Sequence, residues 1–120
     1  MAPWIRAWCE FAVRISDDIH VTDTGSTDGT LEILSEYPIE VAHEKIRSPY
    51  DWDEGRIRNG LLRRCRNKWV MQLDADELFG DEFLEVSEEI LDSRKKFLWF
   101  VHYPFWHHPQ FIRIVQWRTK

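Results

Sequence analysis

The stretch IHVTDTGSTDGTLEIL, from Ile19 to Leu34, changes its side-chain pattern halfway along. Ile19 to Thr22 alternates apolar and polar residues, which predicts a short β-strand that ends at Asp23. Gly25 permits the tight turn that must follow, because glycine adopts backbone conformations closed to other residues. Three residues after it are candidate helix N-caps: Ser26, Thr27 and Asp28.

The second half of this stretch predicts a helix. Leu31, Leu34 and Tyr37 recur at helical spacing and supply its apolar face, and Pro38 ends it. The chain is therefore expected to pass from a strand through a tight turn into a helix, which is the repeating unit of α/β folds.

Strand and helix patterns alternate along the rest of the chain. Apolar residues at helical spacing predict further helices at about residues 3–14, 57–65 and 83–91. Apolar runs predict further strands at residues 39–43, 69–73, 97–103 and 111–117. This order predicts an α/β fold whose sheet is parallel at least in its first part.

Acidic residues follow two of the predicted strands. Asp23 ends the first strand, and Asp74 and Asp76 follow the strand at residues 69–73. In open α/β sheets, ligands bind outside the carboxyl ends of the strands. The sequence therefore predicts that both acidic clusters face one binding site.

Composition limits the class of protein. The 120 residues suffice for one domain, and the net charge of -5 gives no global basic field, so we expect no nucleic-acid partner. The two cysteines do not form a disulfide framework, and no apolar run approaches the roughly 20 residues that span a bilayer. We expect a cytoplasmic protein, including the periphery of the inner face of a membrane.

A basic run lies between residues 56 and 68. It consists of Arg56, Arg58, Arg63, Arg64, Arg66 and Lys68. Such a run is typical of a solvated helix face and equally of a surface that meets phosphate groups, and both interpretations stay open.

Two short motifs resemble those of other protein classes. Asp23-Thr24-Gly25-Ser26 matches the active-site loop of aspartic proteases, but helical periodicity follows where that β-fold needs strands. Asp74-Ala75-Asp76 could begin a calcium loop, but Phe79 replaces the required glycine. A phosphatase with an Asp-x-Asp nucleophile motif is disfavoured because Glu77, rather than Thr or Val, follows it.

Three segments, in this order, resemble a family 2 glycosyltransferase of the GT-A fold. They are IHVTDTGSTDGTLEIL, RIRNGLLRRCRNKWVMQLDADE and FLWFVHYPFW, and together they cover Ile19 to Trp106. The resemblance implies a Rossmann-like three-layer sandwich with a mostly parallel sheet. It also implies that residues 1–120 are a single, incomplete donor-binding domain.

The resemblance assigns roles to four residues. Asp76, the last residue of the DXD motif Asp74-Ala75-Asp76, is the expected ligand of Mn²⁺ or Mg²⁺, and Asp74 is expected near the ribose and the metal shell. Asp23 is expected to contact the base of the donor, and Arg58 to lie near the base or the phosphates. The implied reaction is metal-dependent, inverting transfer of a sugar from a nucleotide-diphosphate sugar to an acceptor hydroxyl. UDP-sugar is the expected donor, and a glycan, lipid or protein is the expected acceptor.

The sequence departs from the family pattern at three places. The first strand, which would be central in the sheet, is missing, so we expect an exposed sheet edge through which the chain can self-associate. Thr24 stands where many members carry a second Asp, and no residue before Lys120 is assigned as the catalytic base. An inactive fragment that binds nucleotide or metal is therefore the alternative hypothesis.

Overall fold

The computed structural model describes residues 2–78, 81, 83–85, 87, 97–102 and 113–119, the last two ranges by backbone alone. Its elements are α1 (Ala2–Ile15), β1 (His20–Asp23), α2 (Thr30–Leu34), β2 (Glu40–His43), a 3₁₀ turn (Pro49–Asp51), α3 (Glu54–Arg64), β3 (Trp69–Met71), β4 (Phe97–His102) and β5 (Arg113–Thr119). The predicted α/β class is confirmed. Of the helix predicted at residues 83–91, residues 83–85 are helical and most of the remainder lies outside the described residues.

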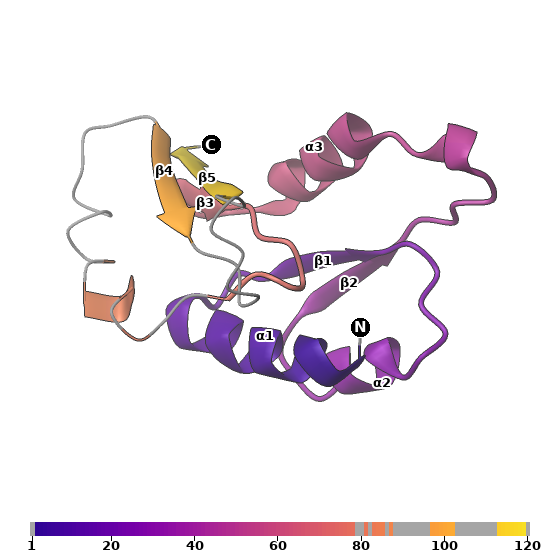
Figure 1. Cartoon of the computed structure of the whole chain (residues 1–120), viewed down its shortest axis with the longest axis horizontal. Helices are drawn as coiled ribbons and strands as arrows, with labels where there is room; N and C mark the ends of the chain where they lie inside the picture. Colours follow the sequence, from indigo (N-terminus) through magenta and orange to yellow (C-terminus); the bar gives the residue numbers. More distant parts are fainter. Residues whose placement is uncertain are drawn as a thin grey trace.

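The strands form two sheets (Figure 1). β1 and β2 pair in parallel, with His20 opposite Glu40 and Asp23 opposite His43. β3, β5 and β4 form an antiparallel sheet in that order. In the part of the chain that is described, β1 and β3 are not paired, and the sheet is interrupted between them.

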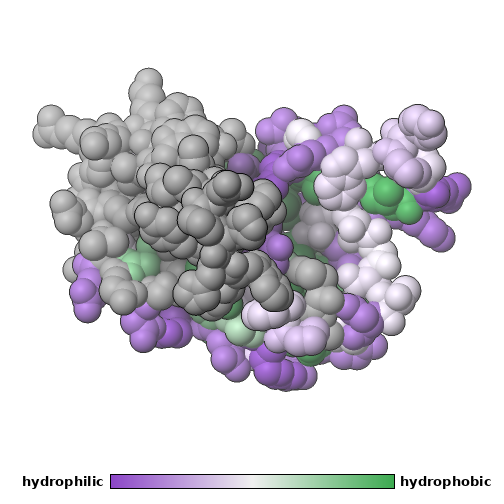
Figure 2. All heavy atoms as spheres, in the orientation of Figure 1, coloured by the Kyte–Doolittle hydropathy of each residue, from purple (hydrophilic) through white to green (hydrophobic). Residues whose placement is uncertain are grey.

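Helices cover both faces of the β1–β2 pair. Figure 1 shows α1 and α2 on one side of these strands and α3 on the other. Hydrophilic residues line the lower rim of Figure 2, where α1 and α2 meet solvent. This arrangement gives the three layers that the resemblance to family 2 glycosyltransferases implies.

The main hydrophobic core joins α1 to β1 and α2. Its buried residues are Ile5, Trp8, Cys9, Ala12, Ile19 and Leu34. Leu34 is the most important anchor of the short helix α2, because only 1% of it is exposed. Burial of a large aliphatic side chain of this kind contributes about 1.5–3 kcal/mol, more than a five-residue helix gains from its own backbone bonds.

A second core connects α1 to the antiparallel sheet. It contains Phe11 of α1, Trp69 of β3 and Phe83, all buried. The rings of Phe11 and Phe83 meet edge to face, with centroids 6.1 Å apart. The two sheets are therefore held by the same helix although they do not pair with each other.

Neither cysteine forms a disulfide in the described part of the chain. Cys9 is buried in the main core, and Cys65 is half-buried after α3. Among the helices in the described ranges, none has the length and apolar content needed to cross a membrane.

The turn between β1 and α2 differs from the prediction in one respect. The N-cap of α2 is Gly29, with φ 84°, rather than one of the three polar residues before it. Asp28 supports the cap from outside the helix, because its Oδ1 accepts from the backbone N–H of Thr30 at 3.3 Å and from its Oγ1 at 2.6 Å. The α-helix ends at Leu34. The predicted last turn to Tyr37 is closed by hydrogen bonds that span three residues instead of four, such as that from the N–H of Tyr37 to the carbonyl of Leu34 at 3.2 Å.

Gly29→Ala is expected to lower the free energy of unfolding by about 1 kcal/mol, because an alanine at a left-handed φ places Cβ against its own backbone. Gly60→Ala is the matched control. Gly60 lies inside α3 with open space around the position of a Cβ, and alanine there is expected to stabilise the protein by about 0.5–1 kcal/mol. Urea denaturation of both variants measures the difference, and equal effects would show that the turn does not require glycine.

Candidate functional site

Asp23 lies at the carboxyl end of β1 and is buried, with 7% of the residue exposed. Its Oδ2 accepts from the backbone N–H of Gly25 and its Oδ1 from that of Ser26, both at 3.1 Å. Burial raises the pKa of Asp23, but hydrogen bonds from Ser26 and Gly25 and a contact with His43 outweigh burial and lower it. The carboxylate is therefore ionised at neutral pH and holds the turn in place.

Arg58 and Asp74 come together although 16 residues separate them. The Nη2 of Arg58 donates to Oδ1 of Asp74 at 2.7 Å, and its Nε donates to Oε1 of Glu54 at 2.6 Å. α3 presents Arg58 because the carboxylate of Asp53 caps that helix, accepting from the backbone N–H of Arg56 at 2.9 Å. The ion pair thus joins the start of α3 to the segment that follows β3.

The DXD motif forms a turn. The backbone N–H of Glu77 donates to the carbonyl of Asp74 at 3.0 Å, and the N–H of Asp74 donates to Oε2 of Glu77 at 2.8 Å. Asp76 sits in this turn with its residue exposed, while Asp74 is partly buried. Two carboxylates of one short turn are oxygen donors of the kind that Mg²⁺ and Mn²⁺ bind.

A cavity of about 450 Å³ lies beside the Arg58–Asp74 pair. Thr22 and Thr24 line it from β1 and the turn after β1, and Trp52 lines it from the segment before α3. Asp23 and Asp76 are not among its lining residues. The structure therefore brings two of the four predicted residues, Arg58 and Asp74, to the wall of one cavity. The other two do not line it, but each directly follows a residue that does: Asp23 follows Thr22, and Asp76 follows Ala75.

Sequence patterns did not identify Trp52 as a site residue. It lies in a loop without periodicity, yet hydrogen bonds of its two neighbours, Asp51 and Asp53, hold the backbone on both sides of it. Asp51 accepts from the backbone N–H groups of Arg47 and Ser48 at 3.2 and 3.0 Å, and Asp53 caps α3. Trp52 remains 52% exposed at the cavity. The one available signal was a large aromatic residue directly before a helix N-cap.

The basic run divides among several partners. Arg56 pairs with Glu44, Arg58 pairs with Glu54 and Asp74, and Arg66 pairs with Asp18. Of this run, Arg58 alone lines the cavity beside the DXD turn. Most of the run therefore binds carboxylates of the chain or faces solvent, and Arg58 is its candidate for phosphate or base.

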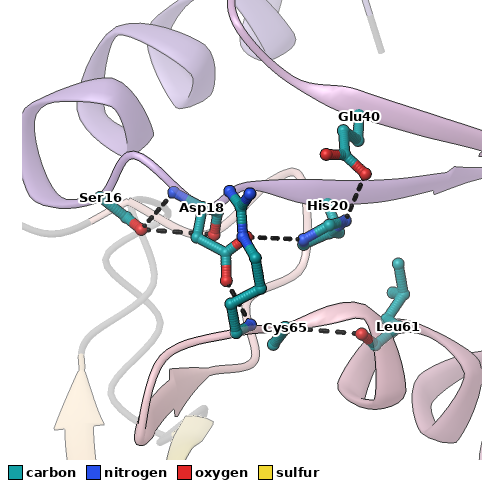
Figure 3. A network of polar contacts seen from close by, with 7 residues as sticks. Ser16, Asp18, His20, Glu40, Leu61 and Cys65 are labelled. Atoms are coloured by element: carbon teal, nitrogen blue, oxygen red, sulfur yellow. Dashed lines mark hydrogen bonds and ion pairs between the residues drawn. The ribbon is translucent and has the colours of Figure 1, made fainter.

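A second polar network lies at the opposite, amino-terminal end of β1. Asp18 has a side chain only 3% exposed, and its Oδ1 lies 2.9 Å from Nε2 of His20. The backbone N–H of Arg66 donates to Oδ2 of Asp18 at 2.6 Å, and Nε of Arg66 donates to Oδ1 at 3.0 Å. Figure 3 shows Asp18 between Ser16 and His20, close to the chain at Cys65. This network joins the loop after α1 to the loop after α3, and we assign it to the fold.

Comparison with known proteins adds independent evidence. The family described as glycosyl transferase family 2 matches residues 12–112. Chondroitin synthase of Escherichia coli is 30% identical over 79 residues, which are 66% of this chain and 11% of that protein. The SPbeta prophage-derived glycosyltransferase SunS of Bacillus subtilis strain 168 is 29% identical over 68 residues, 55% of this chain and 15% of SunS. No solved structure gives a significant match.

The family match covers most of the chain, whereas the chain spans only a small part of these two relatives. The matched range contains Asp23, Arg58, Asp74 and Asp76, the four residues to which the resemblance gave roles. The layered α/β architecture with its parallel pair of strands is that of a partial GT-A domain. The chain therefore belongs to the glycosyltransferases of glycosyl transferase family 2.

Proposed function

We propose that the chain forms the donor-binding part of an enzyme that transfers a sugar from a nucleotide-diphosphate sugar, with UDP-sugar as the expected donor, to an acceptor hydroxyl with inversion. The observation that carries this proposal is the Arg58–Asp74 pair, which lines a cavity beside the DXD turn. Arg58 offers further guanidinium donors to a phosphate or base. No residue is assigned as the catalytic base.

The DXD turn suits a divalent cation shared with the donor. No group of three or more His, Cys, Asp or Glu residues in the described ranges could hold a metal ion alone. Mg²⁺ and related ions are commonly held by one or two carboxylates plus phosphate oxygens. We therefore assign Asp76 as the ligand of Mn²⁺ or Mg²⁺, with Asp74 nearer the ribose. A bound cation would neutralise the charge that develops on the departing diphosphate.

Asp23 is proposed to read the base of the donor. Its carboxylate oxygens accept the backbone N–H groups of Gly25 and Ser26, and Nδ1 of His43 lies 3.7 Å from Oδ2. The lowered pKa of Asp23 supports an acceptor that is fully ionised before the donor binds.

Isothermal titration calorimetry with UDP-glucose, in the presence of Mn²⁺ or of excess EDTA, tests this function. Metal-dependent heat of binding supports it, and the absence of heat for UDP-glucose and for UDP alone in Mn²⁺ refutes donor binding. A turnover assay that follows UDP release then separates a transferase from the alternative, an inactive fragment that binds nucleotide or metal. The interruption between β1 and β3 favours that alternative for this chain taken alone.

The acceptor and the assembly are also proposals. We infer that the acceptor is a glycan, lipid or protein hydroxyl, and that the protein works in the cytoplasm or at the inner face of a membrane. The outer edges of β2 and β4 have no partner strand in the described part of the chain, which supports self-association through a sheet edge. Sedimentation velocity at several concentrations measures the oligomeric state directly.

A further inference from the structure

The loop between β2 and α3 exposes two large aromatic side chains. Figure 1 shows this loop leaving the end of β2 and returning to the start of α3. Tyr50 is 98% exposed and Trp52 is 52% exposed. Of these two, Trp52 alone lines the cavity of the candidate site, whose wall it shares with Arg58 and Asp74. An exposed aromatic ring at the wall of a cavity is a candidate contact for a ligand.

Both ends of this loop are fixed near the carboxyl end of β1. The backbone N–H of Glu44 donates to the carbonyl of Asp23 at 2.8 Å, and the carboxylate of Glu44 accepts from the guanidinium of Arg56 in α3. Thr24, the residue after Asp23, lines the same cavity as Trp52. The loop therefore joins the wall that carries Trp52 to the turn that follows Asp23.

The backbone of Trp52 is held by hydrogen bonds within the loop. Its N–H donates to the carbonyl of Pro49 at 3.4 Å, at the end of the 3₁₀ turn. The carboxylate of Asp51 holds the start of that turn through the backbone N–H groups of Arg47 and Ser48. A ring on an ordered backbone loses little conformational entropy when it contacts a ligand, because only its two side-chain torsions remain to be fixed.

Charge divides the wall of the cavity into two regions. Arg58 carries a positive charge next to the DXD turn, 2.7 Å from a carboxylate oxygen of that turn. Trp52 instead stands between two exposed acids, Asp51 and Asp53. Their negative charges repel a diphosphate. The diphosphate of a donor is therefore expected at Arg58 and the DXD turn, and an uncharged part of the donor at Trp52.

Helix α3 separates these two regions by a suitable length. The N-cap Asp53 directly follows Trp52, and Arg58 lies five residues after that cap. At 1.5 Å per residue the helix rises about 7–8 Å over this interval. This spacing leaves room for a ribose between a group on Trp52 and a diphosphate at Arg58. The uncharged group at Trp52 is then the nucleobase, which also agrees with the place of Asp23 beside Thr24.

We propose that the indole of Trp52 stacks on the nucleobase of the donor, a role that rests on the donor-binding function proposed above. Every base has a π-face, so stacking contributes affinity without selecting among bases. Trp52 therefore supplies affinity for the nucleoside, and the contact of Asp23 with the edge of the base supplies the selection.

Titration of Trp52→Ala with UDP and with ribose 5-diphosphate, both in Mn²⁺, isolates the contact with the base. Ribose 5-diphosphate is UDP without its uracil. We expect the variant to bind UDP about tenfold or more weakly than the parent chain, because a stacked face is lost. Its affinity for ribose 5-diphosphate is expected to change by less than about twofold.

Tyr50→Ala is the matched control, because it removes an exposed ring of the same loop that does not line the cavity. We expect it to change neither affinity. Trp52→Phe keeps a ring that can stack and is expected to bind UDP within about threefold of the parent chain. UDP is also expected to quench tryptophan fluorescence in the parent chain and to quench it much less in Trp52→Phe.

The outcomes separate this role of Trp52 from the donor-binding function. If the parent chain binds UDP and Trp52→Ala binds it equally well, the stacking role is overturned and donor binding stands. If Trp52→Ala weakens UDP-glucose but not UDP, the ring lies on the transferred sugar, and the stacking role is again overturned. Equal losses for UDP and ribose 5-diphosphate would show a structural effect, also against it. If the parent chain binds neither UDP nor UDP-glucose, both proposals fall together.

Discussion

Asp76→Ala is expected to reduce the affinity for UDP-sugar in the presence of Mn²⁺ by on the order of 100-fold. The proposed site relies on few protein carboxylates, so the loss of one leaves the cation held almost entirely by the donor. In excess EDTA, the variant and the parent chain are expected to bind equally weakly. Calorimetric titration of both chains with UDP-sugar, in Mn²⁺ and in EDTA, measures how far the effect of the substitution depends on the metal.

Asp81→Ala is the matched control for this prediction. Asp81 is also an exposed acid after β3, and it pairs with Arg14 at 3.0 Å. Its removal changes the net charge by the same amount but leaves the DXD turn intact, and exposed ion pairs contribute little to stability. Equal losses of affinity in the two variants would show that general charge, and not metal ligation, is responsible.

Asp18→Ala is expected to lower the free energy of unfolding by about 2 kcal/mol. Its carboxylate accepts two hydrogen bonds from Arg66 and contacts the ring of His20, and its side chain is almost fully buried. Alanine leaves the backbone N–H of Arg66 and the buried ring of His20 without this acceptor, whereas the guanidinium of Arg66 is 70% exposed and regains water. Urea denaturation measures the loss, and Asp17→Ala, at the exposed neighbouring position, is expected to change stability by no more than about 0.5 kcal/mol.

The same network predicts an acid dependence of stability. Burial raises the pKa of Asp18, but the hydrogen bonds from Arg66 and His20 and the charge of Arg66 outweigh burial and lower the pKa from 3.8 to about 2. The stabilisation by Asp18 is therefore complete above pH 3.8 and is lost as the pH falls from 3.8 toward 2. In Asp18→Ala this part of the acid dependence should disappear, and an unchanged pH profile would contradict the assignment.

Much of the first half of the fold could be predicted because its signals are local. The alternation at Ile19–Thr22 and the helical spacing around Leu31 depend on neighbours in sequence, and the structure places β1 and α2 there. The N-cap was displaced to Gly29 because a left-handed φ at that residue sets the entry into the helix. Local polarity identified the turn, but not which residue adopts the unusual conformation.

Pairing between distant strands could not be predicted in the same way. The residues Trp69 to Met71 indicate a strand, yet nothing in them specifies β5, which starts more than 40 residues later, as the partner.

In the candidate site, too, some residues could be predicted from the sequence and others could not. The position after a predicted strand indicated Asp74, and the resemblance added Arg58. In the structure Nη2 of Arg58 lies 2.7 Å from Oδ1 of Asp74. Thr24 and Trp52 reach the cavity through loop geometry, which leaves no periodic signal in the sequence.

The bond between Asp18 and Arg66 spans 48 residues, and this separation has a kinetic consequence. Closing so long a loop costs conformational entropy before the contact returns any energy. The contact is therefore expected to form after the folding barrier, once α3 has docked against β1. Its loss should then leave the rate of folding nearly unchanged and accelerate unfolding, so that Asp18 determines how long the native state persists and not how quickly it is reached.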